Sequence, residues 1–155
     1  MGDELLKKQL ETEYLHLQKT IEDFDNRSLL IKGWGVTFSL VQIGLSLYYK
    51  APVLCLIAAI AALLFWALEA SWKGFQYAYG GRIREIETYF SDQSPDKTIA
   101  AFQITNSWYK TFHSEVAGRF FEFARWPHVL MPHAVAVLLG IIMFFLHPNA
   151  HCITP

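Results

Sequence analysis

Three stretches of this 155-residue sequence are long and apolar enough to cross a lipid bilayer. They cover residues 29–48, 51–70 and 128–146, and their only acidic or basic residues are Lys32 in the first and Glu69 in the second. A helix needs about 20 apolar residues to span roughly 30 Å of hydrocarbon, where no water satisfies the backbone. A soluble bundle rarely contains three helices that are apolar on every face. We therefore predict an all-α integral membrane protein with three spans.

The distribution of basic residues predicts the orientation of these spans. Eleven of the 13 Lys and Arg residues lie either before the first span or between the second and the third. Because basic loops remain in the cytoplasm, we expect a cytoplasmic N-terminus and an extracytoplasmic C-terminus. The first residues are polar, so we expect the first span itself to act as the insertion signal.

The three windows divide the chain into five expected segments. They are a cytoplasmic amphipathic helix over 1–28, a transmembrane hairpin over 29–72, a cytoplasmic helical region over 73–127, a third transmembrane helix over 128–147 and an extracytoplasmic tail over 148–155. We expect copies of this chain to assemble as a homo-oligomeric helical bundle in the bilayer.

The N-terminal segment carries an apolar seam at alternating spacings of mostly four and three residues, which is typical of a short heptad pattern. The seam consists of Leu6, Leu10, Tyr14, Leu17, Ile21 and Phe24. Two to three heptads are too few for a strong isolated coiled coil. Two packings remain open, one against residues 96–125 of the same chain and one against copies of itself.

The central segment is predicted to be helical with one interruption. The second span should continue beyond the lipid, with Gly80-Gly81 as a hinge or kink. Residues 91–96 predict a turn, and Ser94 followed by Pro95 is typical of the start of a new helix. That helix should carry an aromatic-rich face, which we interpret as a packing surface. The face consists of Ile99, Phe102, Trp108, Phe112, Val116, Phe120 and Phe123.

Signatures of enzymes and metal sites are weak or missing. The sequence contains no HExxH, GxSxG or Walker motif, so we expect no catalytic residue and no cofactor. His147, His151 and Cys152 have a ligand-like spacing, but they lack a fourth ligand and predict no metal site. A disulfide between Cys55 and Cys152 is geometrically possible, although a buried free Cys55 is favoured.

A stripe of small and polar residues runs along one face of the first span. Its members are Lys32, Gly35, Ser39, Gln42 and Ser46. In hydrocarbon such a face must meet protein or water, so it either holds helices together or lines a pore. Alanines in the second span already offer a packing surface, which leaves the stripe free to line a pore. Three helices cannot enclose a channel alone, so a channel would be a homo-oligomer.

The two charges within the spans predict an ion pair. Lys32 lies where the first span enters the membrane and Glu69 where the second span leaves it, at the same expected cytoplasmic level. Each charge alone would be costly there. We expect them to pair within one subunit or between subunits.

Basic and aromatic residues of the central segment form a candidate ligand site. Acidic neighbours balance them in one subunit, so a solvated face of salt bridges is the alternative. In an oligomer, symmetry would repeat the arginines around the axis, where they could bind phosphate, and aromatic rings such as Trp108 and Tyr109 could stack on a base. The candidate ligand-binding residues are Arg82, Arg84, Trp108, Lys110, Arg119 and Arg125.

Two sequence runs resemble a group of small bacterial membrane proteins. NRSLLIKGWGVT opens the first span and FWALEASWKGFQYAYGGRIREIE closes the second. The KGW entry and the FW-x-L-acid exit are similar to those of Hailong-type membrane channel effectors of antiphage systems. The similarity covers about residues 26–90.

The resemblance implies a homo-oligomeric ion channel of the bacterial inner membrane, for which a tetramer is one candidate assembly. Such a channel depolarises the host membrane on infection and is controlled from the cytoplasm. The implied signal is a nucleotide or a single-stranded oligonucleotide made by a partner enzyme. The alternative is a non-conducting membrane scaffold or interaction protein, in which the stripe only packs helices.

Overall fold

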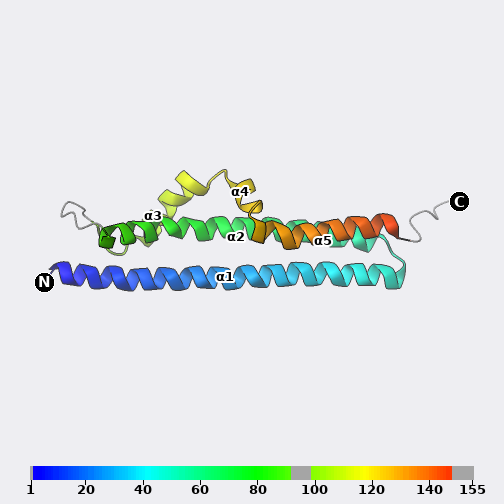
Figure 1. Cartoon of the computed structure of the whole chain (residues 1–155), viewed down its shortest axis with the longest axis horizontal. Coiled ribbons are helices and arrows are strands. Elements are labelled where there is room, and N and C mark those ends of the chain that lie inside the picture. Colours follow the sequence, from blue (N-terminus) through cyan, green and yellow to red (C-terminus); the bar gives the residue numbers. More distant parts are fainter. Residues whose placement is uncertain (1, 92–98, 148–155) are drawn as a thin grey trace. The chain divides into compact units, whose positions relative to one another are not determined.

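The computed structural model describes residues 2–91 and 99–147, and the described part contains helices, turns and no strand (Figure 1). The elements are α1 (Gly2–Tyr49), α2 (Val53–Ser91), α3 (Ile104–Thr111), the π-helical turn η1 (Phe112–Val116), α4 (Phe120–Ala124) and α5 (Pro127–Leu146). The predicted all-α fold is confirmed.

Three of these helices, α1, α2 and α5, are long and apolar enough to cross a membrane. A 20-residue helix such as α5 rises about 30 Å, which matches the hydrocarbon thickness. Large apolar side chains on these helices are exposed, among them Leu40 on α1, Leu64 on α2 and Leu138 on α5. Lipid is the solvent that suits such faces, because exposed apolar surface of this extent associates in water.

The turn between α1 and α2 forms where the sequence stops the helix. Lys50 has a left-handed φ of 53°, and the Ala51 amide donates to the Ser46 carbonyl over 3.0 Å, which closes the end of α1. Pro52 has no amide hydrogen to continue α1, and its carbonyl accepts from the Cys55 amide over 2.9 Å. The chain therefore reverses within three residues.

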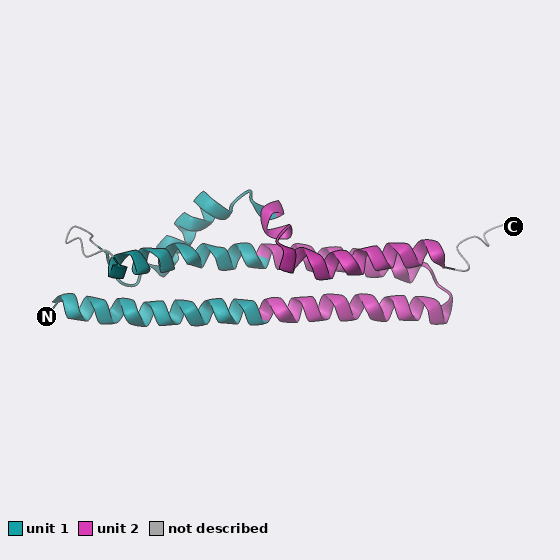
Figure 2. Cartoon of the chain, in the orientation of Figure 1, with its two compact units in different colours: residues 1–26, 72–120 teal, residues 27–71, 121–155 magenta. Residues whose placement is uncertain are grey.

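The chain divides into two compact units, which Figure 2 distinguishes by colour. Unit 1 contains residues 1–26 and 72–120, and unit 2 contains residues 27–71 and 121–155. Unit 1 therefore takes the first part of α1, the last part of α2, α3 and η1. Unit 2 takes the apolar parts of α1 and α2 together with α5.

The core of unit 1 shows which partner the N-terminal seam has. Leu10 and Leu17 on α1 are buried against Ile83 and Ile86 on α2. The residues that pack around them are Leu6, Tyr14, Ile21, Tyr79, Tyr89, Ile99, Ala101 and Ile104. The principal packing surface for the seam is thus the last part of α2, which was not among the predicted partners. The predicted 96–125 segment contributes only at its start.

The central segment of the chain departs from the prediction in two ways. The helix expected directly after Pro95 begins only at Ile104, and Ser94 and Pro95 themselves lie outside the described residues. The expected aromatic helix is broken into α3, η1 and α4, with Gly118 at a φ of 83° before α4. Glycine suits that φ because it carries no Cβ.

The glycine pair of α2 also has a different role from the predicted hinge. The helix continues through Gly80 and Gly81 without a break. A Cβ at residue 81 would overlap the side chain of Thr111, so this glycine lets α3 approach α2 closely. A glycine at residue 81 therefore allows contact between α2 and α3, and it does not bend α2.

Unit 2 is held together by small side chains. Ala58 and Cys55 on α2 are fully buried together with Ile43 on α1, next to apolar residues of α5. A Cβ at Gly140 of α5 would lie 2.9 Å from the Cys55 carbonyl oxygen, so the two backbones are in close contact. Close backbone approach through small residues is the usual packing of helices in lipid. The predicted tail over 148–155 lies outside the described residues.

Candidate functional site

A buried carboxylate collects three polar side chains within unit 2. The Glu69 side chain is fully buried, and its Oε1 lies 3.0 Å from Lys32 Nζ. Ser28 Oγ donates to the same oxygen over 3.0 Å, and His133 Nε2 lies 2.9 Å from Oε2. We call Ser28, Lys32, Glu69 and His133 the Glu69 cluster. It brings together the predicted Lys32 and Glu69 and adds a residue of α5.

The hydrogen bonds of the Glu69 cluster determine which ring nitrogen of His133 carries a proton. A carboxylate that takes bonds from an ammonium and a hydroxyl is an acceptor, so the Nε2 of His133 must donate. His133 is fully buried, and its Nδ1 has no hydrogen-bond partner among the described residues. Lys32, by contrast, keeps 19% of its side chain exposed.

Gly35 provides the space in which the His133 ring lies. A Cβ at residue 35 would be 2.9 Å from Phe65 Cβ and 3.3 Å from His133 Cε1. Gly35, which follows the KGW motif, is therefore required for steric reasons. A side chain at this position would prevent α1 from approaching α2 and α5 so closely.

The stripe of the first span lies largely against the same chain. Ser39 is fully buried, with its Oγ 2.9 Å from the Gly35 carbonyl and 3.1 Å from the Ala58 carbonyl of α2. Ser46 is also fully buried, and its Oγ accepts from the Cys55 thiol over 3.0 Å. Within the subunit, these residues hold helices together. Gln42 of the stripe is only half-buried.

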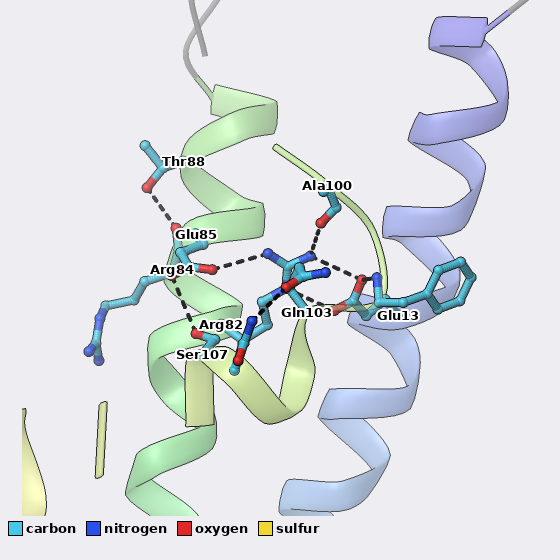
Figure 3. Close-up of polar contacts among 10 residues, drawn as sticks. Glu13, Arg82, Arg84, Glu85, Thr88, Ala100, Gln103 and Ser107 are labelled. Carbon is cyan, nitrogen blue, oxygen red and sulfur yellow. Dashed lines mark hydrogen bonds and ion pairs between the residues drawn. The ribbon is translucent and has the colours of Figure 1, made fainter. Parts of the chain in front are cut away.

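A second buried charge, Arg82 of α2, organises unit 1 (Figure 3). Its Nε donates to Glu13 over 2.8 Å, its Nη1 to Glu85 over 3.1 Å, and its Nη2 to the Ala100 carbonyl over 2.7 Å and to Glu13 over 3.1 Å. Burial disfavours the charged guanidinium, but these carboxylates outweigh that effect and raise the pKa of Arg82 above its ordinary value. We call Glu13, Arg82, Glu85 and Ala100 the Arg82 cluster.

The Arg82 cluster also fixes the chain that leads into α3. Glu13 Oε2 accepts from the Phe102 amide over 2.9 Å. Phe102 has a left-handed φ of 62°, which is unfavourable for a residue with a side chain, and the residue is 74% exposed. Arg82 was expected to bind ligand, but it makes four hydrogen bonds to its own chain. Glu13, which the sequence analysis did not single out, is its main partner, and only the tertiary structure reveals the pairing.

Of the candidate ligand-binding residues, Arg82, Arg84 and Lys110 line one groove, whereas the others lie elsewhere. Arg84 pairs with Glu115 over 2.9 Å, and Arg119 Nη1 donates to the Glu115 carbonyl over 2.9 Å. Trp108 stacks on Phe112 and donates to a backbone carbonyl of α2. Arg125 belongs to unit 2, whereas the other five residues belong to unit 1.

This polar groove of about 860 Å³ lies in unit 1 between α2 and α3. Arg84 and Lys110 line it together with Asn106 and with the carboxylates of Glu85 and Glu115. The groove is therefore mixed in charge. Within the described residues no group of His, Cys, Asp or Glu could hold a metal ion, and His151 and Cys152 lie outside them.

Comparisons of the chain with protein-family models, curated proteins and solved structures found no match.

Proposed function

We propose that this chain is a membrane protein that conducts ions as a homo-oligomer. One observation carries the proposal. Lys32 and His133 contact the fully buried carboxylate of Glu69, and these three residues come from three helices that are long and apolar enough to cross a membrane. Ionisable side chains within lipid are costly, and those that persist typically mark pathways for ions or protons.

The contacts of the stripe indicate that only some of its residues would line the conduction path. Ser39 and Ser46 are fully buried inside the subunit, whereas Gln42 and Lys32 stay partly exposed. We therefore place Lys32 and Gln42 beside the path and Gly35, Ser39 and Ser46 behind it. Three helices cannot surround a path, so several copies, with a tetramer as one candidate, would enclose it.

Control from the cytoplasm is a further part of the proposal. The groove beside α3 offers Arg84 and Lys110 to a phosphate-bearing nucleotide or a single-stranded oligonucleotide made by a partner enzyme. The orientation with the N-terminus in the cytoplasm follows from the basic residues. The role as an antiphage effector of the bacterial inner membrane follows from the resemblance alone.

One set of contacts favours a second candidate, a non-conducting membrane scaffold. Gly35, Ser39 and Ser46 pack against other parts of unit 2, as residues that only hold helices together would do. In such a protein the Glu69 cluster would fix the helices, and Gln42 would contact a neighbouring copy.

Recording from the purified full-length protein in planar bilayers separates the two candidates. Gln42→Leu removes a polar group from the proposed path, so we expect a several-fold change in conductance with an unchanged oligomer size by light scattering. Thr37→Leu is the matched control, because Thr37 is an exposed residue of α1 outside the stripe. Recordings are made with and without added single-stranded oligonucleotide.

A purified oligomer that never conducts under either condition, and whose expression leaves the membrane potential unchanged, would contradict the channel and leave the scaffold. Equal effects of Gln42→Leu and Thr37→Leu on conductance would contradict the proposed path.

A further inference from the structure

The helical turn that leads into α5 carries one exposed aromatic residue and one exposed cation. Phe121 of α4 is 70% exposed, and Arg125, one turn later, is exposed as well. The Arg125 amide donates to the Phe121 carbonyl over 3.2 Å, so the two residues share one face of the turn. The opposite face is buried, since Phe123 is 3% and Ala124 is 7% exposed.

Contacts within unit 2 fix this turn at the end of the apolar part of α2. Trp66 of α2 donates its indole N–H to the Ala124 carbonyl over 2.9 Å, and Ala70 of α2 is buried together with Ala124 and with Val129 of α5. Residues 66–70 close the apolar window of α2, and Val129 lies at the start of that of α5. The turn therefore lies where both apolar windows end, which is the level of the lipid headgroups.

One face of α5, the helix that follows this turn, is apolar and exposed. Met131, Val135, Leu138 and Ile142 recur at spacings of four and three residues, and more than half of each residue is exposed. Residues at these spacings share one side of a helix, and lipid chains are the surroundings that suit such a side. A phospholipid whose chains lie along α5 has its headgroup at the level of Arg125.

The charges of this turn indicate which headgroup would fit. The Arg125 guanidinium makes no hydrogen bond or ion pair within residues 2–91 and 99–147, whereas Glu122 of the same turn has an interaction of its own. A guanidinium offers parallel N–H donors that match two phosphate oxygens. An anionic phospholipid combines such a phosphate with a net negative charge, which a zwitterionic lipid lacks.

We propose that Phe121 and Arg125 form a binding site for an anionic phospholipid. The Arg125 guanidinium holds the headgroup phosphate, and the Phe121 ring lies against the first part of the acyl chains, as apolar side chains of interfacial segments do. Bound lipid would hold α4 at the membrane surface while Trp66 ties it to α2. The site goes beyond the proposed function, because it requires neither conduction nor a nucleotide.

Native mass spectrometry of the detergent-solubilised full-length protein tests the site. The protein is incubated with equal amounts of phosphatidylglycerol and phosphatidylcholine that carry the same acyl chains, so that only the headgroup differs. We expect several-fold more phosphatidylglycerol than phosphatidylcholine to stay bound, and Arg125→Gln to remove most of this preference.

Two further variants separate the parts of the site. Arg125→Lys keeps the cation but loses the paired donors, so its preference should be intermediate between those of the wild type and Arg125→Gln. Phe121→Ser should lower the retention of both lipids, because it removes the contact with the chains and leaves the cation. Lys8→Gln is the matched control, because it removes an exposed cation of α1 that lies far along the chain from the three apolar windows.

Three results would overturn the proposal. The first is an unchanged headgroup preference in Arg125→Gln whose circular dichroism matches that of the wild type. The second is an equal loss of preference in Lys8→Gln, which would show a general effect of charge. The third is displacement of phosphatidylglycerol by millimolar inorganic phosphate, which would show a site for free phosphate and not for lipid.

Discussion

The two buried charge clusters differ in how completely their polar groups are satisfied. In unit 1, Arg82 donates to Glu13, Glu85 and a backbone carbonyl, and the Glu13 side chain is buried whereas that of Glu85 is 42% exposed. In unit 2, Glu69 receives three donors, but the cluster ends at a nitrogen of His133 that has no partner within residues 2–91 and 99–147. A fully satisfied buried network helps to specify one structure, whereas a buried polar atom without a partner is costly. The Arg82 cluster is therefore the more completely paired of the two, and we expect it to contribute more to stability.

The largest expected effect is on the complete cluster. Arg82→Met would leave Glu13 buried without its cation and would release the Ala100 carbonyl, so we expect a loss of about 3–5 kcal/mol in the free energy of unfolding. Chemical denaturation of the detergent-solubilised protein, followed by circular dichroism, measures this loss. Glu13→Gln combined with Arg82→Met should cost less than the sum of the single changes. Additive losses would mean that the pair does not act as a unit.

A smaller effect is expected in the incomplete cluster. Glu69→Leu leaves Lys32 without its carboxylate in apolar surroundings, and we expect a loss of roughly 2–3 kcal/mol, limited because the ammonium can turn towards the surface. Lys32→Met in the same chain should recover much of that loss. Thermal unfolding in detergent, measured for both singles and the double, gives the coupling. An absence of coupling would contradict the ion pair between Lys32 and Glu69.

The smallest effect is expected at an exposed pair of unit 1. Arg84 and Glu115 lie 2.9 Å apart, but their side chains are 51% and 40% exposed. Water screens such pairs, so Arg84→Met should change the free energy of unfolding by less than about 1 kcal/mol. The same denaturation experiment serves as the reference for Arg82→Met, two residues away on α2. A loss as large as that of Arg82→Met would show that burial does not explain the difference.

Much of the fold of unit 2 could be predicted from local sequence. Windows of about 20 apolar residues determine a helix in lipid irrespective of its neighbours, so the helical content of 29–48, 51–70 and 128–146 followed directly. The meeting of Lys32 with Glu69 was also accessible, since each charge was the only acidic or basic one in its span. The part of His133 could not be predicted, because nothing in the local sequence shows that α5 brings it to Glu69.

Unit 1 was harder to predict, for a physical reason. Its decisive contacts join residues far apart in the chain, such as Glu13 with Arg82 and Leu10 with Ile86. An arginine between acidic neighbours has the same local pattern whether it is solvated or buried. The start of α3 at Ile104 also involves a tertiary contact, because the Phe102 amide donates to Glu13 and not to a carbonyl of a helix.

The glycines of the first span differ in how freely evolution could replace them. Gly33 and Gly44 meet nothing within 4 Å where a Cβ would stand, so an alanine there would displace no neighbour. Gly35, and Gly140 on α5, stand where even one methyl group would press on another helix. Positions facing lipid can exchange one apolar residue for another with little consequence. Distant descendants of this chain should therefore retain these two glycines long after their other residues have diverged.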